Sequence, residues 1–164
     1  MKNPHKLFAD VALRFAQESH CVSKHVAAVA VSDNRIICTG INGTPKGTQN
    51  CDNFWLDTYV REPRALSFSD WIKTDEWRQL HMDWSTKNEI HAEQNMIAQA
   101  ARNGISLQNC DIYVTLSPCV NCSKLLCALQ PNAVYYVNQY DKAGGEVEEL
   151  FRLSGIKLEQ VYAT

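Results

Sequence analysis

At 164 residues the chain is long enough for one domain with an apolar core, and we expect a single domain over residues 1–164. Hydrophobic residues make up 45% of the sequence and charged residues 21%, which excludes a disordered chain, and no segment approaches the roughly 20 apolar residues of a membrane span. The net charge of −2, without a dense Lys/Arg cluster or an apolar signal segment, predicts a cytoplasmic protein that binds neither membrane nor nucleic acid.

The first quarter of the chain predicts a helix followed by a hairpin. Residues 5–20 carry apolar side chains at helical spacing, and Pro4 stands at the helix start. Residues 26–31 form a short apolar and β-branched run, a turn follows at Asp33-Asn34, and residues 35–39 resume the apolar character. This pattern indicates two largely buried strands joined by a tight turn.

A long insertion is expected at about residues 43–88. The segment contains glycines, two prolines and many polar residues, interrupted by four tryptophans. It is typical of loops with one or two short helices, and loops this long in compact domains are usually functional or held in place internally. We expect the tryptophans to fill a small core; the alternative is that they stack on bases, as in single-strand-binding proteins.

The rest of the chain alternates between helices and strands. Such alternation indicates an α/β domain with helices on both faces of one sheet. Gly104 is expected to end the first of these helices and Pro131 the second. The predicted elements are a helix at 91–102, a strand at 111–116, a helix at 119–129, a strand at 133–137, a helix at 146–153 and a strand at 156–162.

Two short motifs carry chemistry, and both open a predicted helix. Cys119 and Cys122 can direct their sulfurs at one ion, and the helix dipole stabilises thiolates there. His91 would complete a set of three protein ligands, which leaves the fourth tetrahedral position to water, as in catalytic zinc sites. Glu93 is close enough to His91 to exchange protons with that water without binding the metal.

Together, H-x-E and P-C-x-x-C form the zinc-deaminase signature. They predict that Glu93 transfers protons while water replaces an amine at C4 of cytosine. The alternative is a zinc-ribbon-like structural site with a fourth Cys or His, in which Glu93 would be a solvated helix residue. The other cysteines at 38, 110 and 127 lie among apolar residues and are expected to be small core side chains.

From about residue 8 to about residue 162 the sequence resembles the deoxycytidylate (dCMP) deaminases, particularly those of bacteriophages. The similarity rests on G-I-N-G-T-P-K-G at residues 40–47, where Ile41 replaces the usual Tyr, on H-A-E-Q-N at residues 91–95, and on the long insertion. The resemblance implies a cytidine-deaminase-like three-layer α/β/α sandwich with a central mixed sheet. It also implies hydrolysis of dCMP to dUMP and ammonia, which supplies dUMP for dTTP synthesis, by a homohexamer. The enzyme would be activated by dCTP and inhibited by dTTP, each bound with Mg²⁺.

The same resemblance implies roles for further residues. A second, structural zinc would be held by Cys21, Cys51, His81 and Glu89; otherwise these are thiols and polar residues without a metal. The residues expected to bind substrate are Asn42, Ala92 and Tyr140. The residues expected to bind effectors are Lys24, Gly43 and Arg102. Gln99 stands where a relative has an aromatic residue near the nucleotide interface, so the effector response is expected to be altered.

Two other functions remain open from the sequence. A tRNA adenosine deaminase shares the H-A-E and P-C-x-x-C motifs, but the Asn42-Gly43 stretch, the insertion and the absence of a basic tail argue against it. A non-catalytic nucleotide-sensing protein on the same fold is the other possibility. Retention of Glu93 beside a three-ligand metal site argues against that second function.

Overall fold

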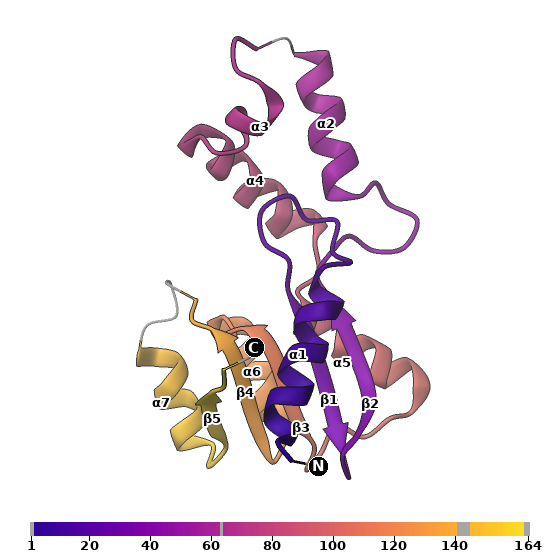
Figure 1. The fold of residues 1–164 in the computed structure, drawn as a ribbon, viewed down its shortest axis with the longest axis vertical. Helices are drawn as coiled ribbons and strands as arrows, with labels where there is room; N and C mark the ends of the chain where they lie inside the picture. Colours follow the sequence, from indigo (N-terminus) through magenta and orange to yellow (C-terminus); the bar gives the residue numbers. More distant parts are fainter. Residues whose placement is uncertain (1, 63, 141–144, 163–164) are drawn as a thin grey trace.

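A five-stranded mixed sheet forms the centre of the computed structural model, which describes residues 2–62, 64–140 and 145–162 (Figure 1). The strand order is β2-β1-β3-β4-β5; β1 pairs antiparallel with β2 and β3, whereas β3, β4 and β5 run parallel. The strands are β1 (Ala27–Ser32), β2 (Arg35–Ile41), β3 (Asp111–Leu116), β4 (Ala133–Asn138) and β5 (Lys157–Gln160). This topology confirms the predicted mixed sheet.

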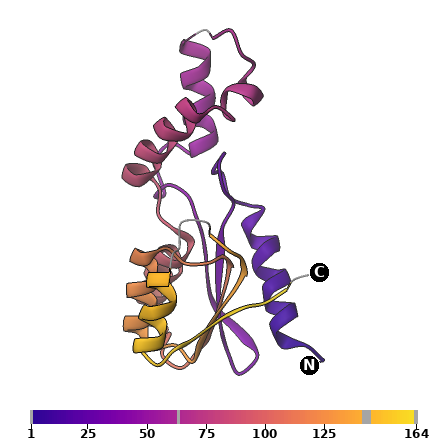
Figure 2. The ribbon, with the colours of Figure 1, turned by 90° about the vertical axis from the view of Figure 1, so that its left-hand side faces the viewer.

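Helices cover both faces of the sheet, which confirms the predicted α/β/α arrangement (Figure 2). Helix α1 (Pro4–Ala16) packs with Val29 and Tyr113 on one face. Their neighbours Ala28 and Ile112 point to the other face, because successive strand residues alternate. That second face is covered by α5 (Ala92–Asn103), α6 (Val120–Leu129) and α7 (Gly145–Leu153). Across the described ranges, none of the helices has both the length and the hydropathy to cross a membrane.

Helix α1 (Pro4–Ala16) ends four residues earlier than the sequence predicts. Past Ala16 the chain tightens into a turn, with the amides of Glu18 and Ser19 bonded to carbonyls three residues back at 3.0 Å each. The Ser19 hydroxyl then donates to Asn42 Oδ1 at 2.7 Å, which holds the chain away from the helical path. The segment so released carries Cys21 and Lys24, and both line the pocket described below.

The insertion is mostly helical, so the expectation of loops with one or two short helices was wrong. It contains α2 (Cys51–Arg61), α3 (Phe68–Trp71) and α4 (Asp75–Asn88), which stand apart from the sheet in Figure 1. Thr74 caps α4 by accepting a hydrogen bond from the Trp77 amide at 3.2 Å. The apolar faces of these helices pack on each other through a cluster that includes Trp55, Trp71 and Trp77, which confirms the packing role of these three tryptophans.

Gly40 allows α5 to lie directly on β2. A Cβ atom at this position would lie 2.1 Å from the carbonyl oxygen of Ala92 and 2.4 Å from the backbone nitrogen of Met96. Backbone atoms cannot move aside cheaply, so we expect Gly40→Ala to cost about 3 kcal/mol or more, at or beyond the top of the usual range for overpacking. Denaturant unfolding measures this loss. Gly43→Ala is the control, since a Cβ there has no neighbour within 4 Å; equal stability of the two variants would contradict the prediction.

Candidate active site

His91, Cys119 and Cys122 converge where α5 and α6 begin. His91 is the N-cap of α5 and Cys119 the N-cap of α6. The His91 Nδ1 atom lies 3.6 Å from Cys119 Sγ and 3.4 Å from Cys122 Sγ. A tetrahedral zinc with ordinary Zn–S and Zn–N bonds separates such atoms by about 3.6 Å. The three side chains therefore fit one zinc ion, as the two motifs predict.

The local electrostatics favour a bound cation at this cluster. The side-chain contact with Cys122 is the largest cause that lowers the pKa of Cys119 to about 3, and His91 lowers it further. Cys119 is therefore a thiolate at neutral pH, and the N-terminus of α6 helps to stabilise its charge. A thiolate beside a second cysteine and an imidazole is a donor set that zinc prefers.

Glu93 lies beside this cluster in the first turn of α5. Its side chain is buried, with 4% of its surface exposed, and burial is the main cause that raises the pKa of its carboxyl above the usual value. The neighbouring His91 acts in the opposite direction. A carboxyl group whose pKa is raised toward neutrality can both accept and return a proton, which suits a general acid–base.

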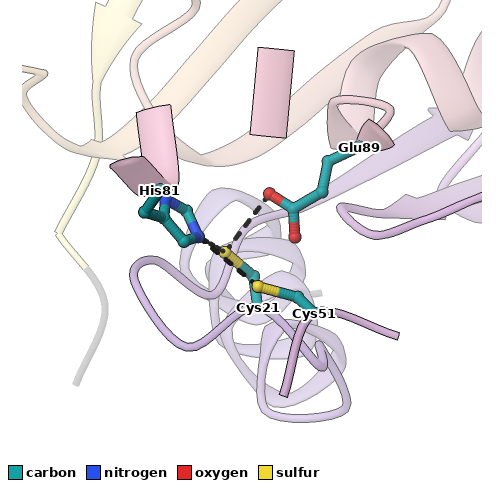
Figure 3. Close-up of side chains that lie close together, drawn as sticks. All are labelled: Cys21, Cys51, His81 and Glu89. Carbon is teal, nitrogen blue, oxygen red and sulfur yellow. Dashed lines mark hydrogen bonds between the residues drawn. The ribbon is translucent and has the colours of Figure 1, made fainter. Parts of the chain in front are cut away.

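A second cluster joins the insertion to the segment after α1 (Figure 3). The Cys21 Sγ atom lies 3.6 Å from His81 Nε2 and 3.4 Å from Glu89 Oε2, and the Cys51 Sγ atom lies 3.4 Å from His81 Nε2. These spacings also match a tetrahedral zinc, for which about 3.6 Å is expected. Four converging protein ligands give a closed, structural type of site.

The charges in this second cluster also favour a bound cation. The contact with Cys51 is the largest cause that lowers the pKa of Cys21 to about 3. Burial, followed by repulsion from Cys21, raises the pKa of Glu89 to about 7. The buried Glu89 Oε1 atom has no hydrogen-bond partner among the described residues. A divalent ion would compensate the negative charges of Cys21 and Glu89 and displace any proton that they carry.

One cavity of about 620 Å³ connects the two clusters. Its wall includes His91 and Cys119 of the first cluster, the adjacent Glu93, and His81 and Glu89 of the second cluster. The volume is within the range of small-molecule sites. The cavity is also lined by Lys73, Arg78 and Ser117, which the sequence analysis did not single out. No local motif marks Lys73 and Arg78, because only the folding of the insertion brings them to the cavity. Ser117 directly precedes the P-C-V-N-C motif at the end of β3.

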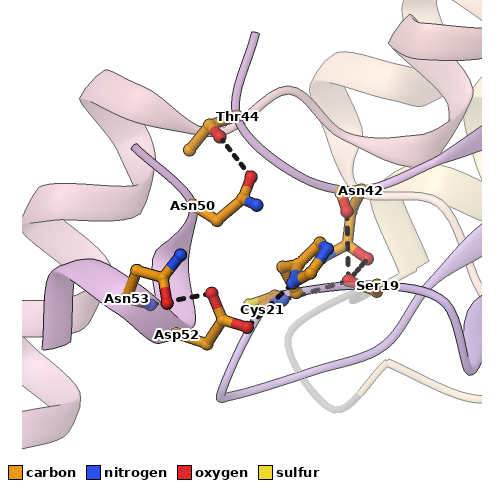
Figure 4. Close-up of polar contacts among 8 residues, drawn as sticks. Ser19, Cys21, Asn42, Thr44, Asn50, Asp52 and Asn53 are labelled. Atoms are coloured by element: carbon orange, nitrogen blue, oxygen red, sulfur yellow. Dashed lines mark hydrogen bonds and ion pairs between the residues drawn. The ribbon is translucent and has the colours of Figure 1, made fainter. Parts of the chain in front are cut away.

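The three residues predicted to bind substrate, Asn42, Ala92 and Tyr140, all line this cavity. The Asn42 amide holds the loop after α1, because its Oδ1 accepts from Ser19 Oγ at 2.7 Å (Figure 4). The same Oδ1 accepts from the Val26 amide at 2.8 Å. Its Nδ2 donates to the Lys24 carbonyl at 2.9 Å. Asn42 therefore shapes the pocket, and contact of these three residues with a substrate stays a prediction.

The three residues predicted to bind effectors lie in different places. Lys24 lines the catalytic cavity, and Gly43 forms an isolated antiparallel bridge with Ile90. Arg102 is exposed in the last turn of α5, on the order of 14 Å along the helix axis from Glu93. Gln99 accepts a hydrogen bond from the Thr39 amide at 3.1 Å. Within a single chain, Lys24, Gly43 and Arg102 do not form one site. Their binding of effectors therefore stays a prediction.

The predicted core positions of three cysteines are borne out in two cases. Cys38 and Cys110 are buried, and burial is the main cause that raises the pKa of each thiol. Cys127 on α6 is only partly buried. None of these three belongs to either ligand cluster found among the described residues, so the seven cysteines divide into four candidate ligands and three others.

Residues 2–138 match the model of the cytidine and deoxycytidylate deaminase zinc-binding region. The chain is 40% identical to the deoxycytidylate deaminase of Enterobacteria phage T2 over 92% of this chain and 88% of the phage protein. It is 37% identical to that of Enterobacteria phage T4 over 92% of this chain and 86% of the phage protein. Among solved structures, the apo dCMP deaminase of cyanophage S-TIM5 superposes with a TM-score of 0.67 at 25% identity, covering 96% of each chain.

Proposed function

Because the chain belongs to the cytidine and deoxycytidylate deaminase family, and within it to the deoxycytidylate deaminases, we propose that it hydrolyses dCMP to dUMP and ammonia. The observation that carries this proposal is the buried Glu93 beside a three-ligand cluster in a cavity large enough for a nucleotide. The resemblance inferred from the sequence is confirmed at the level of the family.

In the proposed mechanism, His91, Cys119 and Cys122 hold the catalytic zinc. When bound, zinc supplies Lewis acidity and lowers the pKa of a water in its open position. Glu93 takes a proton from the attacking water and delivers a proton to N3 as C4 is attacked. It then transfers the proton of the new C4 hydroxyl to the amine; the C4–N bond breaks as the C4 carbonyl forms, and dCMP and water become dUMP and ammonia. Burial of Glu93, which raises its carboxyl pKa, supports both transfers.

We further propose that Cys21, Cys51, His81 and Glu89 bind a second zinc that holds the insertion in place. Their 3.4–3.6 Å ligand spacings and the unpartnered Glu89 Oε1 support this proposal. Regulation by dCTP and dTTP with Mg²⁺, assembly into a hexamer, and substrate contacts by Asn42, Ala92 and Tyr140 rest on the family resemblance. Effector contacts by Lys24, Gly43 and Arg102 rest on it as well.

An ultraviolet assay of dCMP loss on protein of known zinc content tests the proposed reaction. We expect conversion to dUMP that increases with dCTP and Mg²⁺ and decreases with dTTP. Unchanged rates with either effector would contradict the regulatory proposal alone. No turnover of dCMP, together with deamination of an anticodon stem–loop, would contradict the proposed substrate and favour a tRNA adenosine deaminase.

A further inference from the structure

Ser117 supplies a buried hydroxyl in the wall of the cavity that the proposed proton transfers do not involve. It follows the last residue of β3, and 5% of its surface is exposed. Its Oγ atom accepts a hydrogen bond from the backbone amide of Tyr140 at 2.7 Å. Tyr140 lines the same cavity and is predicted to contact the pyrimidine. The hydroxyl therefore connects a residue expected to bind substrate to the segment that leads into the P-C-V-N-C motif.

This hydrogen bond replaces the next bond of the ladder between β3 and β4. The two strands are parallel and pair Leu116 with Asn138, and the Ser117 amide donates to the Asn138 carbonyl at 2.8 Å. In a regular parallel pair, Ser117 would accept the following bond, from the Tyr140 amide, with its own carbonyl oxygen. Its side chain accepts that bond instead. The regular ladder ends at this point, and the Ser117 hydroxyl determines where Tyr140 lies.

The position of Ser117 is closely tied to the catalytic ligand cluster. Pro118 follows it, and proline fixes its own φ and restricts the preceding residue to extended conformations. Cys119, the next residue, is the N-cap of α6 and a member of the three-ligand cluster. Few backbone torsions therefore separate Ser117 from a candidate zinc ligand, and its hydrogen bond sets the distance from Tyr140 to the metal cluster.

Two further contacts hold the chain around Tyr140. The Asn138 Nδ2 atom donates to the Thr115 carbonyl at 3.1 Å, which fastens the end of β4. The Lys24 ammonium lies 4.6 Å from the centroid of the Tyr140 ring, but Lys24 is exposed, and exposed cation–π contacts are weak. The bond to Ser117 differs from both, because it is buried and fixes the backbone of Tyr140 itself.

We propose that Ser117 is a positioning residue for the deamination, and that its hydroxyl holds Tyr140 at the distance from the metal cluster that the cytosine ring requires. This inference rests on the proposed reaction and on the proposed contact between Tyr140 and the base. A stacking contact of this kind is made in the bound substrate and in the transition state alike. Its loss raises KM and leaves kcat nearly unchanged. Displacement of a zinc ligand would instead lower kcat.

The first test is the kinetics of Ser117→Ala. We expect KM for dCMP to rise about 10-fold, the upper end for one hydrogen bond, and kcat to change by less than about 2-fold. Zinc content should equal that of the parent protein. Ser117→Thr keeps a hydroxyl and should restore most of the loss. Ser106→Ala is the matched control, because the Ser106 hydroxyl also accepts a backbone amide, that of Gln108 at 3.3 Å, but lies outside the cavity.

A double-mutant cycle with Tyr140→Ala tests whether Ser117 acts through Tyr140. Once the tyrosine ring is absent, the further change Ser117→Ala should alter KM by less than about 2-fold. Full additivity of the two losses would overturn the inference. An unchanged KM in Ser117→Ala would also overturn it, as would a loss of kcat together with a loss of zinc.

Hydrogen–deuterium exchange of the ligand-free protein separates this inference from the proposed function, because it needs neither substrate nor turnover. Mass spectrometry with residue-level fragmentation should show that the Tyr140 amide exchanges about 10-fold faster in Ser117→Ala and at nearly the parental rate in Ser117→Thr. An unchanged exchange rate in Ser117→Ala would overturn the inference even if the protein deaminates dCMP. The expected exchange in a parent protein that does not turn over dCMP would contradict the proposed function and leave the contact between Ser117 and Tyr140 established.

Discussion

Replacing Glu93 with Gln is expected to lower dCMP turnover by about 10²–10⁴-fold, the range of general acid–base catalysis. The amide has nearly the same shape as the carboxylate, so the buried site should remain packed. It can neither take a proton from water nor return one to N3 or the amine. Glu93 lies outside the three-ligand cluster, so zinc content should not change. A steady-state dCMP assay beside elemental analysis measures both quantities.

The control for this variant is Glu148→Gln on α7, which removes an exposed carboxylate and should retain the parental rate. Parental turnover by Glu93→Gln would contradict the proposed proton transfers. Loss of turnover together with loss of zinc would instead assign Glu93 to support of the metal cluster. Retained zinc with lost turnover is the outcome that the mechanism requires.

Replacing Cys51 with Ser is expected to reduce bound zinc from about two ions per chain to about one and to loosen the insertion. Serine is a poor zinc ligand, and Cys51 begins α2 within the second cluster. Without that metal, the insertion depends on its small cluster of tryptophans. A loss of about 3 kcal/mol would lower Tm by roughly 6–12 °C in a chain of this size. Calorimetry and elemental analysis measure these changes, and limited proteolysis should cut within residues 43–88.

Cys127→Ser is the matched control, because Cys127 is partly buried in α6 and lies outside both clusters. It should retain both metals and the parental proteolysis pattern. Two zinc ions per chain in Cys51→Ser, with unchanged resistance to protease, would rule out the second metal site. Zinc loss without proteolysis would mean that the tryptophan cluster alone keeps the insertion folded.

The amino-acid sequence determined the features that depend on neighbouring residues. Two residue pairs each lie within one helical turn: Cys119 and Cys122 at the start of α6, and His91 and Glu93 at the start of α5. The start of each helix therefore fixes the geometry of its pair. The hairpin turn could also be predicted from neighbouring residues alone. Asp33 and Asn34 adopt φ values of 49° and 59°, as tight hairpin turns require. The alternation of strands and helices predicted the layers, because buried faces leave a periodic pattern.

Tertiary structure alone decided how the insertion folds and what it faces. Helices α2 and α4 carry many polar residues, and their apolar faces pack mainly on each other, so their periodicity is weak in the sequence. The second ligand cluster spans residues 21 to 89, and spacing by itself did not indicate it; the family resemblance did. Lys73 and Arg78, which line the catalytic cavity, had no local signal either. They reach the cavity only because the insertion folds toward it, and contacts between such distant segments depend on the path of the whole chain.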